Sequence, residues 1–154
     1  MKPRLNPYTA AGAAMQELIS FESHVQSGQG LGIDPQLADL NRMRSSQITG
    51  CAFCINMRST EAREHGESEK RLYLLDALRA SPLYSPSERA ALPWTEAVTR
   101  GADSHVPDET FAMAQEQFSE PELVAFTLLV TSIKAWNRVA IAFRSVHPVE
   151  HTKH

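Results

Sequence analysis

Helix-start signals recur along this sequence, and they constrain the fold more than any other feature. An Asp-Pro pair at residues 34–35 supplies a capping side chain followed by a proline, which the first turn of a helix tolerates. The segments SPSE at 85–88 and SEPE at 119–122 have the spacing of a capping box. Runs of β-branched residues are few and apolar and polar residues do not alternate cleanly, so the sequence predicts an all-α fold.

Apolar residues at helical spacing predict a series of helices in one domain over residues 1–144. Gly28 and Gly30 indicate a loop at 28–33, Gly50 separates two helices, and Pro93 predicts a kink within another. A polar tail follows at 145–154. With 154 residues, 42% of them hydrophobic, the chain is long enough to bury a core. The expected helices cover 7–27, 34–49, 51–65, 68–80, 85–100, 108–118 and 120–144.

Composition and charge exclude several classes of partner. The formal net charge is −3 and no basic block stands out, so nucleic acid is not an expected partner. The N-terminus lacks the apolar core of a signal peptide. The longest apolar stretch, 123–143, is interrupted by Lys134, Asn137 and Arg138, which a bilayer would bury at high cost. We therefore expect a core helix there, no membrane partner, and a cytoplasmic protein.

Cys51 and Cys54 are the only cysteines in the chain, and they form a C-x-x-C pair directly after Gly50. At a helix start they are i and i+3 neighbours, beside free N–H groups and the positive end of the helix dipole, which favour thiolate. A zinc site needs about four ligands, and no second cysteine pair or suitably spaced histidine pair supplies them. A redox-active dithiol is the favoured interpretation, and two inert buried thiols are the alternative.

Arg58 lies four residues after Cys54, on the same stripe of the expected helix. A fixed cation there would stabilise a thiolate, but a guanidinium stays protonated and cannot carry a proton. The alternatives are an ordinary surface arginine, or one that pairs with Asp39 or Glu61. His65 lies eleven residues beyond Cys54, about 16 Å along a straight helix. We interpret it as a polar residue near a helix end.

Several segments together resemble a known family. They are the cysteine segment at 46–57 (SQITGCAFCINM), residues 66–72 (GESEKRL), 88–92 (ERAAL) and 135–138 (AWNR). These segments are similar to the AhpD-like alkylhydroperoxidases, within the carboxymuconolactone decarboxylase superfamily, and the likeness extends in order over roughly residues 10–144. The resemblance implies an all-α fold and assembly as a homo-oligomer, a trimer or a hexamer.

The resemblance also implies a peroxidase mechanism. Cys54 would attack a hydroperoxide and become a sulfenic acid, Cys51 would resolve it as an intramolecular disulfide, and a thiol reductant or redox partner protein would restore the dithiol. A glutamate twelve residues before the first cysteine and a histidine four after the second would relay the proton. Here those positions hold Asp39, a shorter acid, and Arg58, so we expect weak or differently directed activity. No cofactor and no metal is expected.

Two other functions remain open at this point. One is a non-redox enzyme of the decarboxylase branch that acts on a lactone or another small acid, although that branch does not need the cysteine pair. The other is a non-catalytic oligomeric protein whose thiols are merely packed. Helices with two apolar sides, such as the one at 120–144, favour self-association in either case.

Overall fold

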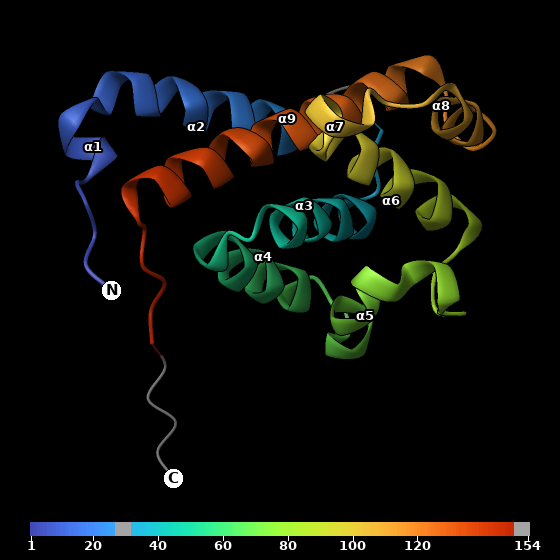
Figure 1. The fold of residues 1–154 in the computed structure, drawn as a ribbon, viewed down its shortest axis with the longest axis horizontal. Helices are drawn as coiled ribbons and strands as arrows, with labels where there is room; N and C mark the ends of the chain where they lie inside the picture. Colours follow the sequence, from blue (N-terminus) through green and yellow to red (C-terminus); the bar gives the residue numbers. More distant parts are fainter. Residues whose placement is uncertain (27–31, 150–154) are drawn as a thin grey trace, which may run out of the picture.

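The computed structural model describes residues 1–26 and 32–149, and in that part of the chain every regular element is a helix, as the sequence predicts (Figure 1). The elements are α1 (Pro7–Ala10), α2 (Gly12–Gln26), α3 (Pro35–Thr49), α4 (Ala52–Glu64), α5 (Glu69–Leu74), the 3-10 helix η1 (Leu75–Ala80), α6 (Pro86–Thr99), α7 (Gly101–Ser104), α8 (Asp108–Gln115) and α9 (Glu120–Phe143). They form a single all-α domain, and the expected boundary between domain and tail at residue 144 stays a prediction.

Helix α3 is the centre of the fold, because it packs against α4, α6 and α9 (Figure 1). An unbroken run of its residues, from Leu37 to Ser46, is buried. Leu40 is fully buried in an apolar cluster between α3, α4, η1 and α6. Polar side chains also cross this core: Thr95 of α6 donates to Asn41, and Thr99 donates to Ser45 over 3.0 Å. Their hydrogen bonds fix the position of α6 against α3, since a buried polar group without a partner is costly.

The predicted helix starts are confirmed in atomic detail. Asp34 accepts a hydrogen bond of 3.0 Å from the Leu37 N–H and begins α3. Ser85 with Glu88, and Ser119 with Glu122, form the two expected capping boxes. α6 continues through Pro93 as one helix. Local capping therefore sets where α3, α6 and α9 begin.

The structure departs from the predicted helices at three places. The first predicted helix is interrupted at Ala11, where the backbone leaves helical geometry; its last predicted residue, 27, and residues 28–31 of the predicted loop lie outside the described residues. The helix expected over 68–80 changes after Leu74 into a 3-10 helix, whose three residues per turn keep Leu75 and Leu78 on one buried face. The short helix α7 was not predicted.

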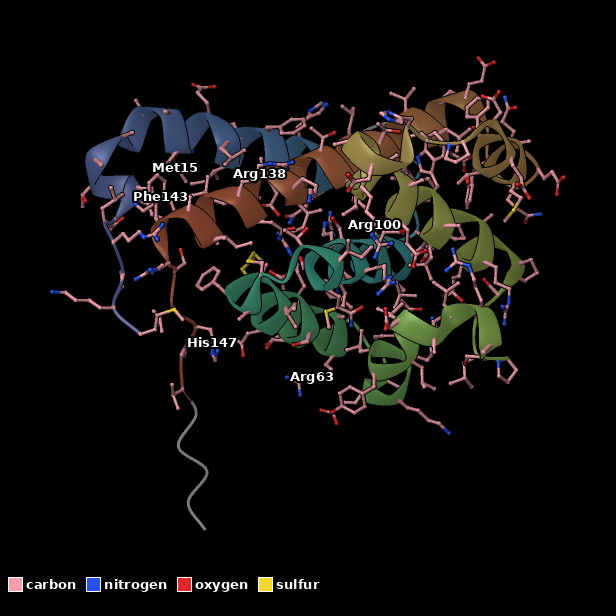
Figure 2. All side chains as sticks on the ribbon, in the orientation of Figure 1. Met15, Arg63, Arg100, Arg138, Phe143 and His147 are labelled. Carbon is pink, nitrogen blue, oxygen red and sulfur yellow. A yellow bond between two sulfur atoms is a disulfide. The ribbon has the colours of Figure 1, made fainter. Side chains whose placement is uncertain are left out.

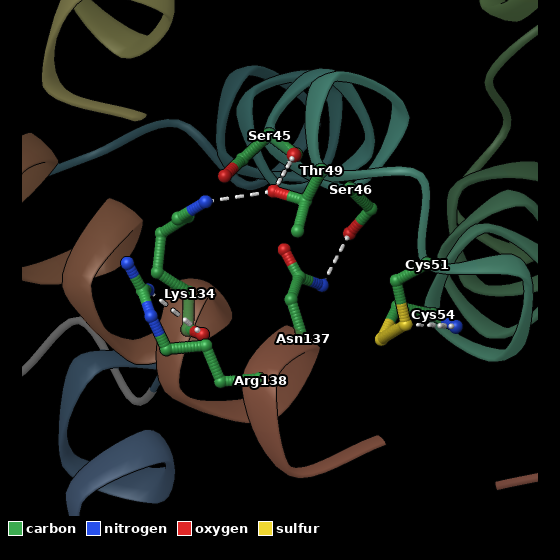
Figure 3. The surroundings of a disulfide bond; sticks show 8 residues. All are labelled: Ser45, Ser46, Thr49, Cys51, Cys54, Lys134, Asn137 and Arg138. Carbon is green, nitrogen blue, oxygen red and sulfur yellow. Dashed lines mark hydrogen bonds between the residues drawn. A yellow bond between two sulfur atoms is a disulfide. The ribbon is translucent and has the colours of Figure 1, made fainter. Parts of the chain in front are cut away.

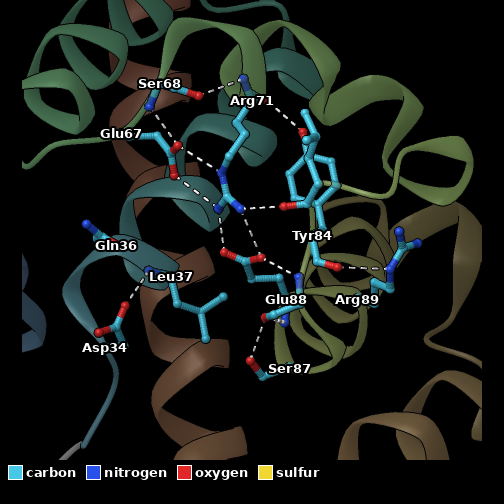
Figure 4. Close-up of polar contacts among 12 residues, drawn as sticks. Asp34, Gln36, Leu37, Glu67, Ser68, Arg71, Tyr84, Ser87, Glu88 and Arg89 are labelled. Atoms are coloured by element: carbon cyan, nitrogen blue, oxygen red, sulfur yellow. Dashed lines mark hydrogen bonds and ion pairs between the residues drawn. The ribbon is translucent and has the colours of Figure 1, made fainter.

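An ion-pair network joins α5 to α6, and its members come from two of the segments that carry the family resemblance (Figure 4). Arg71 donates to Glu67 over 2.9 Å and to Glu88 over 2.5 Å, and its guanidinium lies 5.2 Å from the centre of the Tyr84 ring. The Tyr84 hydroxyl donates back to the Arg71 carbonyl. These motif residues hold the fold together, and they lie in a part of the chain that contains neither cysteine.

Helix α9 is long and apolar enough to cross a membrane by length and composition alone. In the folded chain it packs instead against α2, α3 and α6, and it runs alongside α2 in Figure 1. Phe126 and Val130 on it are buried, whereas Val124 is 58% exposed. This arrangement is that of a core helix, as the interrupting polar residues predict.

Shortening Leu40 tests the central role of α3. Leu40→Ala removes a fully buried side chain and leaves a cavity, so we expect it to lower the free energy of unfolding by about 2–5 kcal/mol. Val149→Ala, beyond the end of α9, changes a side chain that is 69% exposed and should alter it by no more than about 0.5 kcal/mol. Urea denaturation followed by circular dichroism measures both, and equal losses would contradict the assignment of α3 as the core.

Candidate functional site

The two cysteines lie at the junction of α3 and α4, joined by a disulfide bond (Figure 3). Gly50 has a φ of 72°, the left-handed conformation that ends α3 and that a side chain at this position would strain. Cys51 then caps α4, because its sulfur accepts the Cys54 N–H over 3.2 Å. The two Cα atoms are 5.3 Å apart, a separation that permits a disulfide without movement of the backbone. The predicted placement of the pair at a helix start is confirmed.

The sulfur atoms are enclosed by α9 and by the first turn of α4. Both cysteines are only 1% exposed, and they cluster with Ala140 and the partly buried Phe53. Asn137 of α9 donates to the Ser46 hydroxyl over 3.2 Å on the side facing the disulfide (Figure 3). A reactive thiol in this position would lie at the positive end of α4, which favours the thiolate.

Arg58 is buried, at 2% exposed, and its guanidinium lies between two carboxylates. It donates to Glu61 over 2.7 Å, which was one of the expected alternatives, and it forms a second ion pair with Glu22 of α2. Its Nε atom has no hydrogen-bond partner among the described residues. The interpretation as a surface arginine is wrong. Stabilisation of a thiolate by Arg58 stays a prediction. The carboxylates of Glu22 and Glu61 balance much of the positive charge that such stabilisation would need.

Asp39 does not pair with Arg58 among the described ion pairs, and it binds two other groups. Its carboxylate is 4% exposed, lies 2.5 Å from Nδ1 of His65, and accepts from Arg42 over 3.3 Å. The hydrogen bond and the negative charge of Asp39 raise the pKa of His65 above its ordinary value of 6.5. His65 follows the last residue of α4, at the opposite end from Cys54, so the pair lies remote from the sulfurs along the helix.

Sequence reasoning missed the Asp39–His65 pair and the contribution of Glu22. The Asp39–His65 pair could have been predicted from the sequence, since α3 and α4 form an antiparallel hairpin around Gly50. Residues at similar distances on either side of this turn, such as Asp39 and His65, come together. The Glu22–Arg58 ion pair could not, because Glu22 lies on α2 and Arg58 on α4, and no local spacing in the sequence links these helices.

Charged side chains of α2, α3 and α4 form one cluster beside a cavity of about 350 Å³. Asp39, Arg42, Glu61 and His65 line this cavity on one side. Burial lowers the pKa of Arg42, and the neighbouring Arg58 lowers it further, whereas the surrounding carboxylates oppose both effects. Carboxylate and imidazole together can hold or move a proton here. Among the described residues, no three His, Cys, Asp or Glu side chains gather as a metal centre requires.

Comparison with known proteins gives a consistent set of relatives. Residues 12–97 match the sequence model of the carboxymuconolactone decarboxylase family. The uncharacterized protein YdfG of Bacillus subtilis (strain 168) is 35% identical over 142 residues, which cover 92% of this chain and 95% of that protein.

Two solved structures show the same fold. A protein of unknown function from Agrobacterium tumefaciens, provisionally named antioxidant defence protein AhpD, superposes with a TM-score of 0.92 at 40% identity, over 97% of this chain and all of that one. The debrominase Bmp8, solved with 2,3,4-tribromopyrrole, has a TM-score of 0.82 at 18% identity, over 92% of this chain and 74% of that one. The second likeness concerns the fold alone.

Replacing Arg58 tests whether its ion pairs stabilise the fold. Arg58→Gln leaves Glu22 and Glu61 close together without their shared cation, so we expect a loss of about 2–3 kcal/mol in the free energy of unfolding, discounted for the partial exposure of Glu61. Arg63→Gln removes an exposed pair on the outer side of the same helix (Figure 2) and should cost no more than about 0.5 kcal/mol. Equal losses in urea denaturation would contradict a structural role for Arg58.

The raised pKa of His65 predicts a specific pH dependence of stability. Because the folded-state pKa is the higher one, the protonated imidazole stabilises the fold, fully below the unfolded value of 6.5 and progressively less as the pH rises through the folded value. The stability gap between wild type and His65→Gln should therefore be largest on the acidic side. In an Asp39→Asn background the gap should depend much less on pH, because Asp39 is the largest cause of the raised pKa and only the weaker effects of Glu61 and Glu64 remain. Urea denaturation from about pH 5 to about pH 8 measures it, and a constant gap in the unmodified background would refute the pairing.

Proposed function

The chain belongs to the carboxymuconolactone decarboxylase family, and on that premise we propose that it is a thiol oxidoreductase that reduces hydroperoxides through Cys54 and Cys51. The observation that carries the proposal is the position of the pair. Cys51 caps α4, Cys54 lies in its first turn, and their Cα atoms are 5.3 Å apart. Dithiol and disulfide forms are both compatible with this backbone.

The proposed reaction proceeds in two steps. The Cys54 thiolate attacks the terminal oxygen of a hydroperoxide, the O–O bond breaks, and with one proton the products are an alcohol and a sulfenic acid on Cys54. The Cys51 thiolate then attacks the Cys54 sulfur, a disulfide forms, and the hydroxyl leaves as water after taking up a proton. A thiol reductant or a redox partner protein supplies the two electrons that restore the dithiol.

Proton delivery is the altered part of this proposed site. A guanidinium is a poor proton relay, and that of Arg58 is engaged with Glu22 and Glu61. Asp39 is bound to His65 and Arg42, toward the far end of α4. Since general acid–base assistance is commonly worth about 10²–10⁴-fold, we expect slower peroxide reduction than in a site that has a histidine beside the thiols.

We also propose a cytoplasmic homo-oligomer, a trimer or a hexamer. Exposed apolar side chains on α9, such as Val124 and Ile141, support association with further copies of the chain. The burial of both cysteines favours one rival, a non-catalytic oligomeric member of the family whose thiols are packed and inert. The same experiment decides between the two.

Peroxide titration of the reduced protein tests the proposed function. With cumene hydroperoxide, we expect peroxide loss together with formation of the Cys51–Cys54 disulfide, measured by colorimetric assay and by mass spectrometry. Cys54→Ser should abolish peroxide loss, because the attacking thiolate is gone. Cys51→Ser should react once and stop at a sulfenic acid on Cys54, because no resolving thiol remains.

Ser46→Ala is a matched control for damage to the local structure, since its hydroxyl binds Asn137 beside the disulfide but carries no redox chemistry. It should retain peroxide reduction. An unmodified protein that consumes no peroxide and forms no disulfide would support the inert scaffold and end the peroxidase proposal.

A further inference from the structure

A cleft of about 810 Å³ lies on the side of α9 that faces the end of α3 and the α6–α7 corner. Its volume is in the range of small-molecule sites, which commonly span about 300–1,000 Å³. Residues of all four helices line it: Ile48, Val98, Thr99, Arg100, Gly101, Ala102, Asp103, Val130, Thr131, Lys134, Ala135 and Arg138. Neither cysteine and none of the Asp39–His65 cluster is among them, so the cleft is separate from the groups discussed above.

Three of the lining side chains are cations, and their charge is not balanced. Arg100, Lys134 and Arg138 form no ion pair within 4.0 Å in the described part of the chain. Among the described residues, Lys134 donates only to the Thr49 hydroxyl, over 2.9 Å, and Arg138 donates to the Lys134 carbonyl, over 3.3 Å (Figure 3). Asp103 is the single acid on the lining, so the cleft is positive in a chain whose net charge is −3.

Cations that are buried or partly buried elsewhere in the fold have carboxylate partners, which Lys134 lacks among the residues that the structure describes. Arg44 is held by Glu96 and Asp76, both over 2.8 Å, and Arg71 by Glu67 and Glu88. At the cleft, burial lowers the pKa of Lys134, and the charge of Arg138 lowers it further. Like charges that repel one another, with a single carboxylate on the same lining, are stabilised when an anion binds between them.

The rest of the lining indicates what kind of anion fits. Ile48, Val98 and Val130 supply apolar surface. Guanidinium groups match the geometry of carboxylate and phosphate oxygens. We propose that this cleft is a binding site for a small organic anion, whose carboxylate or phosphate group is held by Arg100, Lys134 and Arg138 while its apolar part lies against the valine and isoleucine side chains.

The cleft adjoins the α3–α4 junction, but the proposed binding of an anion in it does not require thiol chemistry. Thr49, the acceptor for Lys134, is the last residue of α3 and precedes Cys51 by two positions. Asn137, one turn from Lys134 on α9, lies on the other side of this contact, toward the disulfide (Figure 3). Anion binding is thus measurable in the oxidised, the reduced or a cysteine-free protein.

Three small aromatic probes test the proposal. Benzoate and phenyl phosphate carry the two candidate head groups, and benzamide is the neutral counterpart of benzoate. In amide NMR titrations of the whole chain, we expect one or both anions to bind at least about tenfold more tightly than benzamide and to shift Gly101 and Thr131. The anion with the higher affinity identifies the preferred head group.

Matched variants locate the binding. Arg100→Gln and Arg138→Gln remove exposed side chains, so the fold should persist, and each should weaken anion binding about threefold or more. Arg144→Gln makes the same charge change just beyond α9 and outside the cleft, and should leave the affinity unchanged.

Three outcomes would overturn the proposal: no binding of either anion up to about 10 mM, equal binding of benzamide, or equal weakening by Arg144→Gln. A smaller assembly for Arg138→Gln by light scattering, with no anion bound by the unmodified protein, would also overturn it. That result would assign the cleft to contact between copies of the chain.

Discussion

The left-handed turn at Gly50 is the constraint on which the arrangement of this chain's reactive groups depends. A φ of 72° ends α3 within one residue and lets α4 return alongside it. Cys51 consequently stands at the cap of α4 and not inside a longer helix, where its sulfur would lack the exposed N–H groups of a helix start. The same reversal brings Asp39 and His65 together at the far end of the hairpin. One glycine thus sets the positions of both the thiols and the carboxylate–imidazole pair.

The burial of Arg58 explains why carboxylates of α2 and α4 lie beside it. Arg58 is almost fully enclosed, and an unpaired cation there would be costly, so Glu22 and Glu61 accompany it. A neutral histidine at this position would need no such partners. Arg58 therefore belongs to an ion-pair cluster that joins α2 to α4 and stabilises the fold. It also replaces the histidine that the family resemblance implies for proton relay.

The sequence allowed prediction of those features that local chemistry determines. Capping side chains and prolines predicted where α3, α6 and α9 begin, and Gly50 predicted the break before the cysteines, because each acts within a few residues. The change to a 3-10 helix after Leu74 was not predictable in this way, since it depends on how Leu75 and Leu78 pack against α3. The Glu22–Arg58 pair and the cationic cleft were also inaccessible, because each joins helices far apart in the sequence.

The ion pairs of Arg58 and the cations of the cleft obey the same rule: the more a charge is buried, the more it needs a partner of opposite charge. Arg58 is closed to solvent, so its charge must be matched internally, and Glu22 and Glu61 match it. Arg100 and Arg138 remain exposed, where water screens their repulsion and no internal partner is required. Lys134 is intermediate: it is partly buried and, within the described part of the chain, hydrogen-bonded only to a neutral hydroxyl. It is therefore the cation that gains most from an external anion, because a bound negative charge would replace the hydration that burial has removed.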